Sequence, residues 1–299
     1  MMIWKPNLNA LSVHMNGDKW ELRNKLEVIL SEELNNPTVH VATSGGMDSS
    51  ALVVAAMEIG VEPIVTSFTL DDRESSDFIA ARKLAKYFDL KFVPVFVPTD
   101  SEFVVKSTLD NMARYKLRKK AEIECLYPMI YMISYLSTIG CSNLLSGHGA
   151  DGMFCLSKRG MIHFRKDIET LQGYRRSMMG FDSDGKGGPL GLQRKTHYKA
   201  CENFNIKYHD PYWNKIIYDT FFNCSWEELN KPKQKQPLRS AFPELDLLNI
   251  KNHVNLQLGD SGIREIVGKS MQDRFAPKSK SAVSAYNAVV RRGLVETRI

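Results

Sequence analysis

The sequence has no long hydrophobic run. Across its 299 residues there is no uninterrupted apolar stretch of about 18 residues, the length that a helix needs to cross a bilayer. Its first 20 residues also lack the basic start and apolar core of a secretory signal. We therefore expect neither a signal peptide nor a membrane partner.

Cysteine is scarce and scattered. No two of the five cysteines stand in a CxxC spacing, which argues against a zinc or iron–sulfur site built from thiolates. An odd, dispersed set of thiols is typical of a reducing compartment, so we expect a cytoplasmic protein whose cysteines are buried apolar residues. The five are Cys125, Cys141, Cys155, Cys201 and Cys224.

Neither sign of charge dominates. The chain has 40 Lys and Arg against 34 Asp and Glu, a net charge of +6, which suits an anionic substrate without demanding nucleic acid. The composition, 43% hydrophobic and 25% charged, is that of a globular enzyme and excludes collagenous, coiled-coil and disordered chains. The positive excess is local, because residues 157–200 carry ten Lys and Arg against four Asp and Glu.

Short β-rich runs alternate with amphipathic segments in the first half of the chain. This alternation predicts an α/β fold, a doubly wound parallel sheet with crossover helices, followed by a helical C-terminal part. We expect strands near 38–43, 62–70, 91–97 and 142–145, and helices near 20–34, 51–59, 72–88, 101–120 and 122–138. The expected parts are an N-terminal extension and helix (1–36), an α/β core (37–155), and a basic insertion with helices completing the domain (156–299).

The segment SGGMDSS (44–50) lies between a predicted strand and a predicted helix. Two glycines let backbone N–H groups approach an anion closely, and the helix start adds positive partial charge. Serine hydroxyls can donate to phosphate oxygens, whereas Asp48 would repel a bare phosphate unless Mg²⁺ lay between them. The segment therefore predicts a phosphate-binding loop with magnesium, although it lacks the GxxxxGK[ST] pattern of a Walker loop.

The segment SGHGADG (146–152) ends the last of these predicted strands. It formally contains GxGxxG, but the residues that follow make a poor long helix, and Asp151 would face the pyrophosphate of a dinucleotide. The same residues make chemical sense if Asp151 is a second Mg²⁺ ligand opposite Asp48.

These motifs resemble the ATP-pyrophosphatase (PP-loop) superfamily, whose members cleave ATP between the α and β phosphates. SGGMDSS looks like its SGGxDS loop, and SGHGADG resembles the SGEGxDE loop of asparagine synthetases. Further segments resemble the synthase domain of asparagine synthetases in the correct order. They are VTSFTL (65–70), CLYPMIYMISYL (125–136), FNIKYHDPYWNKIIY (204–218), KQPLR (235–239), NIK (249–251) and LQLGDSGI (256–263).

The resemblance implies an adenine nucleotide alpha hydrolase-like fold, ATP and Mg²⁺ as cofactors, and roles for individual residues. Asp48 and Asp151 would hold Mg²⁺. Lys235 and Lys251 would face the phosphates, and Lys251, for which Lys278 or Lys280 could substitute, would stabilise the transition state of adenylation. The nucleotide would be bound by Ala42 and Leu70 at the adenine, by Ser44, Gly45, Gly46, Asp48, Ser49 and Ser50 at the pyrophosphate, and by Ser146 and Gly147.

Two positions depart from the family pattern. His148 and Gly152 stand where the family has glutamate, and related β-lactam-forming synthetases place tyrosine at the first of them. His148 is accordingly either a general base toward an incoming amine or a residue that fills the space of the glutamate. Either role makes aspartate a less certain substrate.

Glutamine-dependent synthetases begin with a catalytic cysteine in an N-terminal glutaminase domain. This sequence begins Met1-Met2-Ile3 and reaches its loop at residue 44. We therefore expect nitrogen to come from free ammonia, a substrate amine or a separate nitrogen-donating subunit.

The resemblance implies a carbon–nitrogen ligase that adenylates a small-molecule carboxylate, releases pyrophosphate and forms an amide. One alternative is a PP-loop enzyme that modifies a nucleobase or nucleic acid through the basic insertion. We expect the insertion either to contact an anionic partner, with Arg175 and Arg176 as candidates, or to close over the site, and it could equally be a solvated loop. Another alternative is a non-catalytic nucleotide-binding module, which the intact 44–50 segment and Asp151 argue against.

Overall fold

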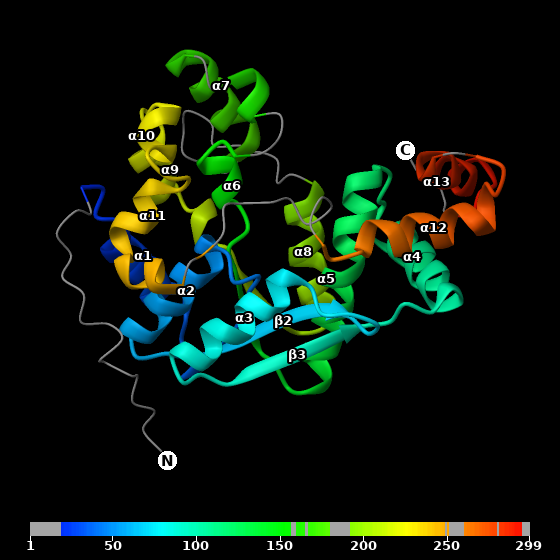
Figure 1. The fold of residues 1–299 in the computed structure, drawn as a ribbon, viewed down its shortest axis with the longest axis horizontal. Coiled ribbons are helices and arrows are strands. Elements are labelled where there is room, and N and C mark those ends of the chain that lie inside the picture. Colours follow the sequence, from blue (N-terminus) through cyan, green and yellow to red (C-terminus); the bar gives the residue numbers. More distant parts are fainter. Residues whose placement is uncertain are drawn as a thin grey trace.

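The computed structural model of the chain describes residues 19–156, 160–164, 167–179, 192–248, 250, 260–279 and 281–294. Within them, one parallel sheet has the strand order β3-β2-β1-β4-β5 (Figure 1). This confirms the predicted doubly wound α/β fold. The strands are β1 (Thr38–Ala42), β2 (Glu62–Leu70), β3 (Phe92–Val97), β4 (Asn143–Ser146) and β5 (Lys207–His209).

Helices connect the strands and form the C-terminal part. The α-helices are α1 (Leu22–Glu33), α2 (Met47–Glu58), α3 (Ser76–Tyr87), α4 (Ser101–Tyr115), α5 (Lys120–Thr138), α6 (Ala150–Met153), α7 (Ile168–Met179), α8 (Leu192–Asn203), α9 (Lys215–Phe221), α10 (Trp226–Asn230), α11 (Gln236–Ala241), α12 (Ile263–Phe275) and α13 (Ala282–Arg291). A π-helix, η2 (Gly160–Phe164), and two 3-10 helices, η3 (Pro211–Trp213) and η4 (Pro243–Leu248), complete the elements.

Alternation of side chains along the strands places apolar residues on both faces of the sheet. Val41 and Val65 face a core that includes residues of α1, α2 and α3. Ile64 and Leu144 face a second core, which is closed by residues of α5, α8, α12 and α13. Helices therefore cover both faces, and α12 and α13 lie beside α4 and α5 (Figure 1).

The order of the strands positions the site. From β1 the chain proceeds outward to β2 and β3 on one side, whereas β4 and β5 lie on the other side of β1. The order therefore reverses at the carboxyl ends of β1 and β4, and ligands bind at such points in open α/β sheets. The loops 44–50 and 146–151 follow these two strands.

The structure differs from the sequence prediction in several places. Helices α2 and α3 begin at Met47 and Ser76 instead of near residues 51 and 72. Strand β5 lies in a region that we expected to be helical, and it pairs with β4, so that Lys207 is opposite Asn143. Helix α4 ends at Tyr115, five residues before the expected end, because Lys116 adopts a left-handed conformation with φ 55°. The division of the chain into three parts stays a prediction.

Candidate active site

The loop after β1 is packed so tightly that one position requires glycine. Gly45 has φ +67°, and a Cβ atom there would lie 2.6 Å from the backbone carbonyl carbon of Ala80 and 2.7 Å from the backbone nitrogen of Ala81. The loop is therefore held against α3 by its backbone. Gly46, the residue before α2, has no side chain to cap the first N–H groups of the helix, so these groups can serve an anion.

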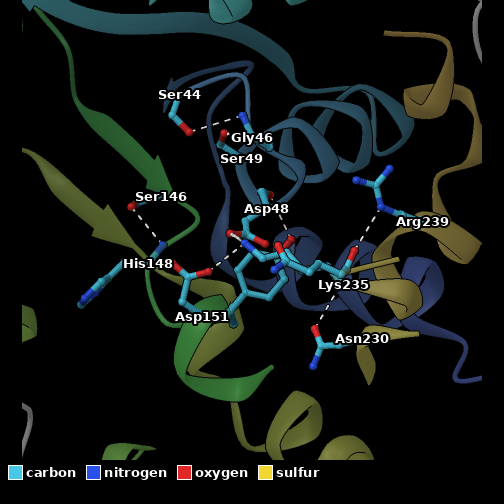
Figure 2. A network of polar contacts seen from close by, with 12 residues as sticks. Ser44, Gly46, Asp48, Ser49, Ser146, His148, Asp151, Asn230, Lys235 and Arg239 are labelled. Carbon is cyan, nitrogen blue, oxygen red and sulfur yellow. Dashed lines mark hydrogen bonds and ion pairs between the residues drawn. The ribbon is translucent and has the colours of Figure 1, made fainter. Parts of the chain in front are cut away.

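The serines of this loop lie in different environments. Ser44 is exposed, and its hydroxyl accepts a hydrogen bond from the Gly46 N–H at 3.3 Å (Figure 2). The Ser49 hydroxyl donates to the Gly46 carbonyl at 3.3 Å. The Ser50 hydroxyl is fully buried and has no hydrogen-bond partner among the described residues, so it lies beneath the loop surface. The binding roles of these serines stay predictions.

The second loop lies directly against the first. A Cβ atom on Gly147 would lie 3.0 Å from the Cβ of Asp48 and 3.1 Å from the backbone nitrogen of Ser49. Ser146 is buried, and its hydroxyl accepts a hydrogen bond from the His148 N–H at 3.2 Å. The absence of a side chain at Gly147 thus allows the two loops to meet.

Asp48 and Asp151 converge on a single cation. The ammonium group of Lys235 contacts Oδ2 of Asp48 and lies 2.8 Å from Oδ1 of Asp151 (Figure 2). Burial lowers the pKa of Lys235, but the charges of the two carboxylates outweigh it, so the pKa lies above its ordinary value. Lys235 is therefore charged at neutral pH. We had expected Lys235 at the phosphates, and the structure places it at the carboxylates.

Two residues that sequence reasoning missed hold this arrangement in place. The Tyr212 hydroxyl, which is buried, donates to the backbone carbonyl of Asp48 at 3.0 Å. The side-chain carbonyl of Asn230 accepts from the Lys235 N–H at 3.2 Å, and its amide donates to the Phe154 carbonyl at 2.9 Å. Both residues lie far along the chain from the loops, and the only available signal was the position of Tyr212 in the 204–218 motif.

The residues expected at the adenine lie at the same edge of the sheet. Ala42 is the last residue of β1, and Leu70 is the last residue of the neighbouring β2. Gly262, from the 256–263 motif, lies beside Leu70, because a Cβ atom there would be 3.1 Å from Leu70 Cδ1. The C-terminal end of the 256–263 motif therefore lies at the edge of the sheet where the adenine is expected.

His148 points away from the carboxylates (Figure 2). Its ring lies 5.1 Å from that of Trp213 and 4.8 Å from that of His197, and its Nδ1 atom is buried without a hydrogen-bond partner among the described residues. Burial lowers the pKa of His148 to about 4, although the charge of Asp210 opposes the shift. Burial therefore disfavours the imidazolium form, and both roles that the sequence suggests for His148 stay predictions.

Part of the basic insertion, residues 157–159, 165–166 and 180–191, lies outside the described residues, as do Lys251 and Lys280. Lys278 is exposed. Arg175 is fully buried and donates to the carbonyls of Met153, Phe222 and Cys224 at 2.8–3.2 Å. The expectation that Arg175 contacts an anionic partner is thus wrong, because its hydrogen bonds join three segments of the fold. Arg176 is exposed and lies over the Phe222 ring.

The carboxylate pair fits magnesium. Among the described residues there is no cluster of three or more His, Cys, Asp or Glu side chains that could hold a metal alone. Mg²⁺ is usually bound by one or two carboxylates together with substrate phosphates and water, so two carboxylates beside a phosphate-binding loop are a suitable donor set. That both already face a cation supports this fit.

The sheet, the glycine–serine loop and the carboxylate pair at the reversal point define a nucleotide-binding α/β protein of the PP-loop class. Residues 35–204 match the family described as asparagine synthase, and since they make up more than half of the 299 residues, the chain belongs to that family. No curated protein matches the chain. The motifs that follow residue 204, including those of Lys235 and Lys251, lie outside the matched segment.

Membership of this family indicates an ATP-using ligase of the adenylating, amide-forming kind.

All five cysteines are free thiols in the structure. In the described ranges, no helix combines the length and the apolar character that crossing a membrane requires.

Proposed function

We propose that the chain is an AMP-forming carbon–nitrogen ligase that adenylates a small-molecule carboxylate and transfers ammonia or an amine to it. The observation that carries the proposal is the convergence of Asp48 and Asp151 beside the glycine–serine loop, from the first turns of α2 and α6, the helices that follow β1 and β4. A ligase that releases pyrophosphate needs fixed hydrogen-bond donors and positive charge at this point, because the leaving group is highly anionic, and the paired carboxylates would hold the divalent cation that supplies this charge.

In the first half-reaction, a carboxylate oxygen of the substrate attacks the α-phosphorus of ATP. The new oxygen–phosphorus bond gives an acyl-adenylate, and the bond between the α-phosphorus and the bridging oxygen breaks to release pyrophosphate. The N–H groups at Gly45 and Gly46 and the hydroxyls of Ser44 and Ser49 bind the pyrophosphate. Asp48 and Asp151 would hold Mg²⁺, which supplies charge neutralisation at the leaving group when bound.

In the second half-reaction, ammonia or an amine attacks the acyl carbon, the bond from that carbon to the AMP oxygen breaks, and the nitrogen loses a proton. By resemblance to the family motif, Lys251 is proposed to act earlier, where it stabilises the transition state of the adenylation step. His148 is neutral, so it can accept a proton or orient the acyl group without adding charge. In this proposal the nitrogen comes from free ammonia, from a substrate amine or from a separate nitrogen-donating subunit.

A substrate-dependent exchange between ATP and labelled pyrophosphate tests the first half-reaction across a panel of carboxylic acids. Asp48→Asn and Asp151→Asn should each lower the exchange rate by at least the roughly 10–100-fold that is typical of losing a residue that only orients a metal ligand, because each removes a proposed ligand itself. Asp110→Asn, on the exposed face of α4, is the matched control and should leave exchange unchanged. AMP production at the wild-type rate by Asp48→Asn, or turnover that yields ADP and phosphate, would contradict the proposal.

A further inference from the structure

Three charged groups meet at the centre of the site. Two carboxylates, those of Asp48 and Asp151, share the ammonium group of Lys235. The side chain of Lys235 is only 6% exposed, against 16% for Asp48 and 38% for Asp151. The lysine is therefore the buried member of the cluster, and the carboxylates separate it from solvent.

The ammonium group and a metal ion would occupy neighbouring positions between the two carboxylates. Lys235 contacts Oδ2 of Asp48 and Oδ1 of Asp151, so a metal ion held by both residues would lie beside the ammonium group whichever oxygen of each residue it used. Mg²⁺ requires its oxygen ligands at about 2.0–2.1 Å, which would bring it within a few ångströms of the ammonium nitrogen. Two cations so close repel each other strongly in a partly buried site, so the two arrangements exclude each other.

The backbone of Lys235 is fixed, although its side chain is long. Its φ angle is 59°, in the left-handed region that a residue other than glycine seldom adopts. Asn230 holds this conformation through the Lys235 N–H, and Asn230 is itself anchored to the carbonyls of Phe154 and Trp226. A change of side-chain rotamer can therefore move the ammonium group while its Cα stays in place.

We propose that Lys235 is a resident counter-ion that blocks the divalent-cation position between Asp48 and Asp151 until nucleotide phosphates arrive. The phosphates give the ammonium group a second anionic partner, so it leaves the carboxylate oxygens and the metal ion enters together with the nucleotide. Lys235 thus makes binding ordered, because the carboxylate pair has little affinity for a divalent cation alone. This inference rests on the proposed ATP-dependent function of the site.

Binding of Mn²⁺ in the absence of nucleotide tests the proposal, with titration calorimetry or the electron paramagnetic resonance of free Mn²⁺ as the measurement. Lys235→Gln should bind Mn²⁺ at least about tenfold more tightly than the wild type, because it removes a positive charge at contact distance from both carboxylates. The wild type should reach comparable affinity only when a non-hydrolysable ATP analogue is added. Equal or weaker Mn²⁺ binding by Lys235→Gln would overturn the proposal.

Lys231→Gln is the matched control. Lys231 precedes Lys235 by four residues but is exposed, so its removal lowers the net charge equally without opening the carboxylate pair. Its Mn²⁺ affinity should equal that of the wild type. An increase as large as that of Lys235→Gln would show that net charge alone is responsible, and this would also overturn the proposal.

Thermal denaturation with and without Mn²⁺ provides a second test, which also applies if Lys235→Gln folds poorly. Lys235→Gln leaves two carboxylates facing each other, so it should melt below the wild type, and Mn²⁺ should restore its stability far more than that of the wild type. The double variant Asp151→Asn with Lys235→Gln should lose most of this response. A variant that stays unfolded in excess Mn²⁺, or a wild type that responds equally, would overturn the proposal.

These measurements need neither an acyl substrate nor turnover. If Mn²⁺ binds as expected but no carboxylate supports exchange between ATP and pyrophosphate, the proposed ligase function fails and the inference about Lys235 stands. If exchange occurs but Lys235→Gln does not gain Mn²⁺ affinity, the inference fails alone.

Discussion

The hydroxyl of Tyr212 donates a hydrogen bond to the backbone carbonyl of Asp48 over 3.0 Å. This bond joins η3 to the first turn of α2, 164 residues apart in the sequence. Because the tyrosine is fully buried, its ring cannot move without repacking the core around α2. Tyr212 therefore fixes the backbone of the residue whose side chain we expect to hold the metal ion.

Tyr212→Phe should weaken nucleotide binding more than it weakens the fold. It removes one buried hydrogen bond, so the free energy of unfolding should fall by about 1 kcal/mol, and the KM for ATP should rise. Tyr286→Phe is the matched control, because Tyr286 is buried in the second core and its hydroxyl donates to Oε1 of Glu124 at 3.3 Å. Denaturation should show a similar loss of stability in the control, and pyrophosphate exchange should show an unchanged KM for ATP. Equal KM values for the two variants would count against a role of Tyr212 at the loop.

Gly147→Ala should disrupt the contact between the two loops. A Cβ atom there would lie 3.0–3.1 Å from Asp48 and Ser49, and the backbone nitrogen of Ser49 cannot retreat as a flexible side chain would. We expect a loss of about 1–3 kcal/mol of stability, and weaker ATP binding in equilibrium titration. Gly173→Ala, in helix α7, has nothing within 4 Å of the added atom and should be neutral or slightly stabilising. Unchanged ATP affinity in Gly147→Ala would show that the loops tolerate separation.

The first four strands and the convergence of Asp48 with Asp151 could be predicted from the sequence. The strands are β-rich runs separated by amphipathic segments, and residues that follow neighbouring parallel strands meet at one edge of the sheet. Strand β5 could not be predicted, because its three residues, KYH, carry no periodic signal and are extended only through pairing with β4. The sheet thus follows from local patterns wherever a strand is long enough to show one.

The burial and contacts of individual charged residues could not be predicted from the sequence. Nothing in the sequence distinguishes the buried Arg175 from the exposed Arg176, since the carbonyls that accept from Arg175 are supplied by distant segments. The contact of Lys235 with both carboxylates has the same origin, because Lys235 lies 187 residues from Asp48. Likewise, the burial that lowers the pKa of His148 is a property of the packed fold.

The stability of the fold should depend on pH through Glu27 in α1. Burial raises the pKa of Glu27 to about 7 from an ordinary value of 4.5, and the hydrogen bond to Glu58 and the negative charge of Glu58 act in the same direction. The positive charge of Arg23 opposes this shift. The folded state thus favours the protonated form, so this contribution to stability is complete below about pH 4.5 and is lost as the pH rises through about 7.

Glu27→Gln, which keeps a hydrogen-bond donor toward Glu58, should remove that dependence. The variant should melt above the wild type at pH 8, and the difference should shrink toward pH 5, as measured by thermal denaturation at a series of pH values. Glu32→Gln, at an exposed position of the same helix, should follow the wild-type profile. Parallel profiles for Glu27→Gln and the wild type would refute the assignment.

His148 lies one residue after Gly147 and three before Asp151, but its ring packs against Trp213 and His197. A pKa of about 4 makes it a weaker base than free histidine, while it keeps the imidazole neutral at every pH at which the reaction would be assayed. The half-reactions separate the two roles that this residue could have, because only the second one requires a proton to leave the nitrogen.

We expect His148→Ala to leave the exchange between ATP and pyrophosphate close to the wild-type rate and to slow amide formation by about 10²-fold, the lower range for a positioned base. Because burial keeps the wild-type imidazole neutral, the acidic limb that His148 contributes to the pH profile should lie near pH 4 and be absent from the variant. Rapid-quench measurement of the two half-reactions, repeated across pH, checks both points. An equal fall in both rates would show that the ring only supports the loop, and a wild-type limb near pH 6.5 that disappears in the variant would show that His148 is charged in the working enzyme.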